Sequence, residues 1–180
     1  LPMAKPNAAL QEKAKKIKAL LFDVDGVLTD GGIIYDAQGN ESKRFHVKDG
    51  MIIKYLRKAN ILTGVITGRA SEVVKFRCDE LAIDIQFHGV QDKGAIYEQI
   101  KSNHNLEDAD IAYIGDDIND LAILQQCGLS ATPADGHAEV QKRVDWVLDT
   151  KGGEGALREF ADFILAGRKD FAEILNLPQT

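Results

Sequence analysis

Two carboxylic acids, Asp23 and Asp25, stand two residues apart at the point where a short apolar run of the sequence ends. Gly26 follows them, and glycine allows the sharp backbone turn that would let both acids face the same side. An isolated Asp-x-Asp sequence is more often a solvated acidic turn than an active site. Its chemical meaning therefore depends on which other groups the fold brings next to it.

A second acidic cluster, at residues 115–120, follows another apolar run and contains Asp116, Asp117 and Asp120. If both runs form central strands of one sheet, Asp23 and Asp116 lie close together. Two desolvated carboxylates repel each other unless a proton or a cation lies between them. Mg²⁺ prefers oxygen ligands, so the pair predicts a magnesium site. One of Asp116 and Asp117 could instead cap a helix.

Two further groups are suited to bind an anion. Thr67 begins a Thr-Gly-Arg sequence that reads as a strand-to-helix turn, and a hydroxyl beside free helix amides suits a phosphate oxygen. Lys93 offers a positive charge that can neutralise a phosphoryl group. A single loop lysine is usually only solvated. The order Asp-x-Asp, Thr, Lys and Gly-Asp-Asp along one chain is much more specific than any of its parts.

The elements that must position these groups alternate along the chain. Short apolar runs separated by helical patterns of about ten residues predict βαβ units and a parallel sheet covered on both faces. The expected fold is α/β, a Rossmann-like three-layer sandwich with a central, mostly parallel sheet, whose ligands bind at the carboxyl ends of the strands. The expected strands are 17–22, 64–66, 83–87, 111–114, 128–132 and 145–148, and the expected helices are 49–60, 71–81, 94–103, 119–126, 138–143 and 155–166.

Residues 31–47 interrupt this alternation. They read as a β-hairpin whose turn is made by Gly39 and Asn40, which forms a small flap directly after the first strand. The tail, residues 167–180, has an apolar helical stripe over 171–177 that packs either on its own body or on a neighbouring subunit. Together, these elements predict a single domain over residues 1–180.

Length and composition limit the classes of function. A chain of 180 residues buries about 70% of its surface on folding, enough for a core without disulfides or structural metal. The net charge of -6 argues against binding to nucleic acid or to an anionic membrane surface. The sequence contains no run of about 18 apolar residues, so no membrane-spanning helix is expected. The expected location is cytoplasmic.

The order of these motifs resembles that of the haloacid-dehalogenase-like phosphohydrolases. The resemblance implies that Asp23 is the nucleophile of an aspartyl-phosphate mechanism and that Asp25 is the general acid and base. It implies that Mg²⁺ is held by Asp23, the Asp25 backbone carbonyl and Asp116. Thr67 and Lys93 would hold the phosphoryl oxygens. Between these motifs the chain has no room for the cap domain of larger members.

Residues 29–31, 45–50 and 152–159 more closely resemble the 3-deoxy-D-manno-octulosonate 8-phosphate phosphatases, which serve lipopolysaccharide precursor synthesis. That resemblance implies a capless homotetramer with its site near subunit boundaries, and a sugar-acid phosphate as substrate. The implied substrate-binding residues are Asp25, His46, Val47, Lys48, Asp49, Gly50, Lys54, Arg69, Arg77 and Lys93.

Several alternatives stay open. Arg77 could form only a surface or interface ion pair, and Lys54 could be an ordinary solvated lysine. The protein could hydrolyse another small sugar phosphate, or be a non-catalytic assembly or phosphate-receiving module. A receiver is disfavoured because its acidic pair comes first in the chain, whereas here an acidic cluster follows Lys93. A dehalogenase does not need Asp25, and a phosphomutase usually requires a cap to exclude water.

Overall fold

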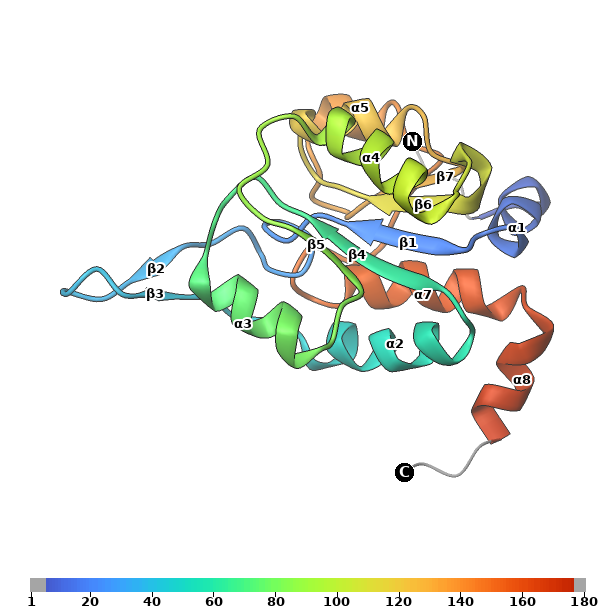
Figure 1. Ribbon diagram of the computed structural model, residues 1–180, viewed down its shortest axis with the longest axis horizontal. Helices are drawn as coiled ribbons and strands as arrows, with labels where there is room; N and C mark the ends of the chain where they lie inside the picture. The colour runs from blue at the N-terminus through green and yellow to red at the C-terminus, as the bar shows by residue number, and fades with distance from the viewer. Residues whose placement is uncertain (1–5, 177–180) are drawn as a thin grey trace.

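A six-stranded parallel sheet forms the centre of the molecule, with strand order β5-β4-β1-β6-β7-β8 (Figure 1). The structure is a computed structural model and describes residues 6–176. The predicted parallel α/β fold is confirmed. The strands are β1 Ala19–Phe22, β4 Leu62–Ile66, β5 Ile85–Phe87, β6 Ile111–Ile114, β7 Leu129–Thr132 and β8 Trp146–Val147.

The register of the three central strands brings the predicted motifs to one edge. Phe22, the last residue of β1, lies between Val65 of β4 and Ile114 of β6. Every residue of β1 is buried, as expected for a strand covered on both faces. The residues that follow these strands, Asp23, Thr67 and Asp116, therefore emerge side by side at the carboxyl edge.

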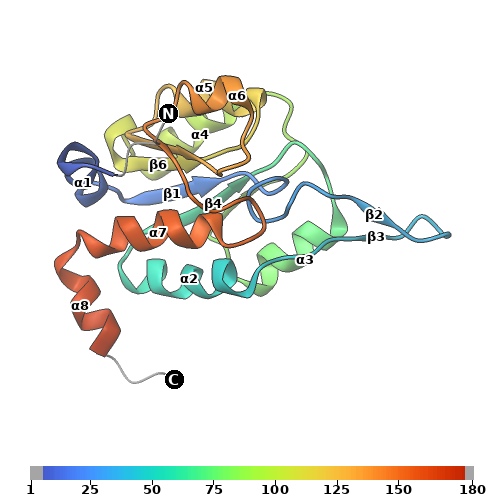
Figure 2. The ribbon, with the colours of Figure 1, turned by 180° about the vertical axis from the view of Figure 1, so that it is seen from behind.

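Helices cover both faces of the sheet (Figures 1 and 2). One apolar cluster contains side chains of α1, α2, α3 and α7, and the other contains side chains of α4, α5 and α6. The helix α1 was not predicted from the sequence. The helices are α1 Ala8–Lys15, α2 Val47–Lys58, α3 Glu72–Glu80, α4 Lys93–His104, α5 Leu121–Leu124, α6 Ala138–Gln141, α7 Ala156–Ala166 and α8 Lys169–Asn176, with 3₁₀ turns at Asp108–Asp110 and Ile118–Asp120.

The predicted flap projects from the body of the molecule (Figure 1). Its two antiparallel strands are short, β2 Ile34–Tyr35 and β3 Glu41–Ser42, and Gly39 has a positive φ of 82° in the turn between them. Only the flap, α2 and the core strand β4 lie between Asp25 and Thr67, and only α4, a 3₁₀ turn and β6 lie between Lys93 and Asp116. The expectation of no inserted cap domain is therefore confirmed.

The tail forms α8 over Lys169–Asn176, and Ile174 of this helix belongs to the apolar cluster that contains α7. Residues 177–180, the end of the predicted tail, lie outside the described residues. Among residues 6–176, no helix is long and apolar enough to cross a membrane.

The turn after β1 is supported by a glycine loop from the other end of the chain. The carbonyl of Val24 accepts from the N–H of Leu28 at 2.8 Å, which folds the turn tightly. Gly153 N–H donates to the Val27 carbonyl at 3.0 Å from the loop before α7. A Cβ atom added at Gly152 would lie 1.8 Å from the carbonyl oxygen of Gly26, so only glycine fits there.

Replacing Gly152 with alanine should therefore lower the free energy of unfolding by about 1–3 kcal/mol, because backbone must move to relieve the clash. Urea unfolding followed by circular dichroism would measure it. Gly167→Ala is the matched control, since its added Cβ meets nothing closer than Lys15 Cγ at 3.7 Å and its φ of -80° suits alanine. Equal stability of the two variants would contradict the close packing of this loop.

Candidate active site

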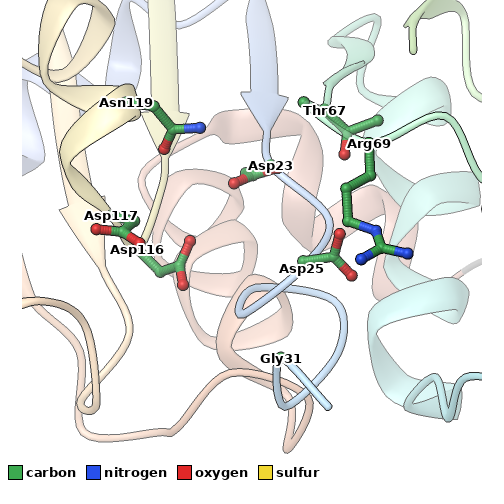
Figure 3. A pocket seen from close by; sticks show the side chains of 9 residues that line it. Asp23, Asp25, Gly31, Thr67, Arg69, Asp116, Asp117 and Asn119 are labelled. Atoms are coloured by element: carbon green, nitrogen blue, oxygen red, sulfur yellow. The ribbon is translucent and has the colours of Figure 1, made fainter. Parts of the chain in front are cut away.

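A pocket opens at the carboxyl edge of the sheet, where β1, β4 and β6 end (Figure 3). Asp23 lies in its middle, with Asp116 on one side and Asp25 and Arg69 on the other. The pocket is lined by Asp23, Asp25, Gly31, Thr67, Gly68, Arg69, Asp116, Asp117 and Asn119.

The predicted crowding of carboxylates is present. Asp23, Asp116 and Asp120 each have a carboxylate oxygen within 4.8 Å of the others. Burial, and then the charge of Asp120, raises the pKa of Asp23 to about 7. Burial, and then the charge of Asp23, raises the pKa of Asp116 to about 8. Such a group is held together by protons or by cations.

Lys93 supplies one of these cations from beneath the pocket. Its ammonium lies 3.1 Å from Asp23 Oδ2 and donates to Asp120 Oδ1 at 2.8 Å, and its side chain is 2% exposed. Burial lowers the pKa of Lys93, but the charges of Asp23 and Asp120 outweigh this effect and raise it overall. The lysine therefore stays charged and fixes the Asp23 carboxylate.

Asp120 has a positioning role that the sequence did not reveal. It is fully buried and accepts four hydrogen bonds, which involve both carboxylate oxygens. Oδ1 accepts from Lys93 and, at 2.6 Å, from the hydroxyl of Tyr113. Oδ2 accepts from the backbone N–H groups of Asp116 and Asp117 at 3.0 and 3.2 Å. These bonds occupy Asp120, so Asp23 and Asp116 are the acids left to bind a metal.

The other residues of the acidic cluster divide between capping and lining the pocket. Asp117 accepts from the N–H of Ile118 at 2.7 Å and caps the 3₁₀ turn, which confirms the capping interpretation for this residue. Asn119 lines the pocket and was not predicted as a site residue. Tyr113, in an apolar run, needs a hydrogen-bond partner once its hydroxyl is buried, but the sequence does not say which residue supplies it.

The phosphate side of the predicted site is formed by the loop between β4 and α3. Thr67 is buried. Its backbone N–H donates to the Phe87 carbonyl of β5, and its carbonyl accepts from the N–H of Val90, both at 3.0 Å. Arg69 lines the same pocket and donates to Glu41 Oε1 of the flap at 2.8 Å. Asp25, on the same side, forms an ion pair with Lys43 of the flap.

A second group of predicted substrate-binding residues lies outside this pocket within one chain. His46, Asp49, Gly50 and Arg77 line a separate small cavity beside α2 and α3. Val47 lines a shallow groove next to it, and Lys48 is exposed in the first turn of α2. The side chain of Lys54 is exposed, with its ammonium 5.2 Å from the centre of the Tyr55 ring. Substrate binding by this group stays a prediction.

Two of these residues have structural partners. Arg77 Nη1 donates to Glu80 at 2.7 Å. Asp49 Oδ1 accepts from the backbone N–H of Arg158 at 2.9 Å, in the first turn of α7, where the capping residue Gly155 offers no side chain. Asp49 therefore joins the amino ends of α2 and α7.

The fold and the acidic pocket define a haloacid dehalogenase-like hydrolase, and the family model described in those words matches residues 81–160. The 3-deoxy-D-manno-octulosonate 8-phosphate phosphatase of Haemophilus influenzae is 42% identical over 156 residues, covering 87% of each chain. That of Yersinia pestis is 38% identical and covers 86% of this chain and 82% of the relative.

Solved structures of the same family resemble this fold. The Moraxella catarrhalis 3-deoxy-D-manno-octulosonate 8-phosphate phosphatase, crystallised with a magnesium ion, a phosphate ion and KDO, superposes with a TM-score of 0.89 at 35% identity, over 92% of this chain and 95% of that chain. The cobalt-bound Haemophilus influenzae enzyme gives a TM-score of 0.84 at 40% identity, over 91% and 98%. The chain belongs to the 3-deoxy-D-manno-octulosonate 8-phosphate phosphatase family.

The environment of Asp49 predicts a pH-dependent stability. Burial, only partly offset by Arg158, His46 and Arg77, raises the pKa of Asp49 from 3.8 to about 6. The folded chain then binds this proton more tightly than the unfolded chain does, so stability falls as the pH rises from about 4 to 6. The cost of the charged form is at most about 3 kcal/mol.

Asp49→Asn keeps an oxygen for the Arg158 N–H and removes the charge. We expect this variant to be more stable than the wild type above pH 6. Its free energy of unfolding should also decrease less than that of the wild type between pH 4 and 6. Chemical unfolding at several pH values measures both. Parallel stability curves for the two proteins would contradict the raised pKa.

Proposed function

We propose that this protein hydrolyses 3-deoxy-D-manno-octulosonate 8-phosphate to 3-deoxy-D-manno-octulosonate and phosphate, as its family does, with Mg²⁺ as cofactor. The observation that carries the proposal is the arrangement around Asp23. Asp116 lies on one side of it and Asp25 on the other, and the Lys93 ammonium is 3.1 Å from its Oδ2 (Figure 3). This arrangement supports the proposal because it brings together the groups that a metal site, a nucleophile and a proton donor require.

The residues present fit a magnesium ion. Asp23 and Asp116 would hold it, together with the predicted Asp25 backbone carbonyl. Burial and the charges of neighbouring carboxylates raise the pKa of both groups, and a bound cation would offset this cost of charging them. Gly26 permits their approach, because a Cβ atom there would lie 1.9 Å from Asp116 Oδ2. When bound, Mg²⁺ would neutralise phosphate charge and so lower the electrostatic barrier to an anionic nucleophile.

The proposed reaction has two halves. A carboxylate oxygen of Asp23 forms a bond to phosphorus, the ester P–O bond breaks, and Asp25 gives its proton to the departing sugar oxygen. Water then attacks phosphorus and gives a proton to Asp25, and the bond between phosphorus and Asp23 breaks to release phosphate. Lys93 keeps Asp23 in place, and Thr67 would bind a phosphoryl oxygen.

We also propose a homotetramer with the site near subunit boundaries, formed by single-domain chains of residues 1–180 in the cytoplasm. In such an assembly, residues 46–50, Lys54 and Arg77 would reach substrate held by a neighbouring subunit. Apolar side chains exposed on the flap and on α3 support this assembly, because such groups favour contact with another chain. They are Ile33, Ile34, Tyr35 and Phe76.

Phosphate release from a panel of sugar-acid phosphates and from simple aryl phosphates tests the activity and its metal. We expect preference for 3-deoxy-D-manno-octulosonate 8-phosphate, loss of activity with EDTA, and recovery with Mg²⁺. Equal kcat/KM values for sugar-acid and aryl phosphates would contradict the substrate while leaving the reaction class. Absence of turnover would favour the non-catalytic module.

Asp23→Asn tests the nucleophile, because an amide oxygen cannot form the phosphoenzyme. We expect kcat to fall by about 10³-fold or more while the circular dichroism spectrum is retained. Asp110→Asn is the matched control, since it changes an aspartate before β6, at the opposite edge of the sheet, and keeps an oxygen for the Glu107 N–H. Full activity of Asp23→Asn would overturn the covalent route.

A further inference from the structure

Lys43 is a buried cation on an otherwise exposed flap. Its side chain is 0% exposed, and its ammonium forms an ion pair with Asp25. The neighbouring residue, Arg44, has a side chain that is 75% exposed. Burying a lysine is costly unless its charge is paired, so its location is set by its partners. The flap therefore delivers one specific positive charge to the active site.

We propose that Lys43 is a positioning residue that orients the carboxyl group of Asp25 for proton transfer to the leaving oxygen. The proposal rests on the proposed function, in which Asp25 is the general acid. It assigns to the flap a part in the chemistry, beyond any part in subunit contact.

Hydrogen bonds at the base of the flap fix the position of Lys43. Glu41 of β3 lies two residues earlier in the chain, and its carboxylate accepts from Arg69 at 2.8 Å and from the Ser71 hydroxyl. Glu41 Oε1 is also 3.9 Å from the Lys43 ammonium. Lys43 is thus held between Asp25 and Glu41, while Glu41 is fastened to the loop that carries Thr67.

The two buried lysines divide the acids of the pocket between them. Lys93 contacts Asp23 and Asp120, on the side of the proposed metal. Lys43 contacts Asp25, whose side chain lies near Arg69 and apart from Asp116 (Figure 3). Since Lys43 draws the Asp25 side chain toward the flap, its carboxyl group is kept apart from the proposed metal-binding carboxylates.

The role of Lys43 predicts a dependence on the leaving group. A sugar alkoxide leaves only with a proton, whereas 4-nitrophenolate is a stable anion that leaves without one. A misplaced Asp25 should therefore slow the alkyl ester much more than the aryl ester. Damage to the fold, to the metal site or to Lys93 would slow both esters alike.

The experiment compares Lys43→Met, Lys43→Arg and wild type in kcat/KM for the sugar-acid phosphate and for 4-nitrophenyl phosphate, at saturating Mg²⁺. We expect Lys43→Met to lower kcat/KM of the sugar-acid ester by about 10²-fold and that of the aryl ester far less. Lys43→Arg should recover part of the loss. Arg44→Met, which removes an exposed cation from the neighbouring residue of the flap, is the matched control.

An equal loss for both esters, or no loss, would overturn the proposal. If Lys43→Met does not fold, Lys43→Gln takes its place in the same comparison. In an Asp25→Asn background, Lys43→Met should add no further selective loss, because the residue it positions is already absent. A wild type inactive on the sugar-acid ester but active on another alkyl phosphate would contradict the substrate alone, and the comparison then uses that ester.

Discussion

Electrostatic repulsion at one edge of the sheet is the constraint on which the site depends. β1 pairs with β4 and β6, and the ends of β1 and β6 are in register. The carboxylates of Asp23 and Asp116, which follow these two ends, therefore lie within 4.8 Å of each other. Both acids are largely removed from water, where like charges are most costly. The surrounding groups either supply positive charge or fix the position of an acid.

The chain meets this constraint with a buried network. Asp120 holds Lys93 against Asp23, and Tyr113 holds Asp120. The backbone N–H groups of Asp116 and Asp117 donate to Asp120, so the same side chain also shapes the turn that presents Asp116. Buried ion pairs contribute little net stability but are expensive to leave half made. Such a network therefore serves to hold the acids in one geometry more than to stabilise the fold.

Much of this arrangement could be predicted from the sequence, because parallel strands buried on both faces read as short apolar runs. The runs ending at Phe22, Ile66 and Ile114 located the site edge correctly. The helix α1 was missed because its face is weakly patterned and mostly polar. The role of Asp120 could not be predicted, since spacing does not reveal that its side chain points inward. Lys43 was missed because the flap reads as an exposed hairpin.

Residues 46–50, Lys54 and Arg77 show another limit of sequence reasoning. Resemblance joined them to the pocket, but within one chain none of them lines it: His46, Asp49, Gly50 and Arg77 line a different cavity, and Asp49 caps α7. Resemblance to a family can imply residues that act across subunit boundaries. The spacing of residues along one chain predicts only which of them lie together within that chain. The structural bond of Asp49 and a role toward a neighbour's substrate are compatible, because only one oxygen of its carboxylate is used by Arg158.

The flap takes on part of what a cap domain would do in a larger relative. A two-stranded hairpin is marginally stable alone, so its position depends on contacts at its base. Glu41 of β3 and Lys43, just after this strand, provide them through ion pairs with Arg69 and Asp25. On the opposite strand Ile34 and Tyr35 are exposed, and the Tyr35 hydroxyl accepts from Arg69 at 3.4 Å. One short element thus links Asp25, the proposed general acid, to the exposed outer face of the flap, and does so without the bulk of an inserted domain.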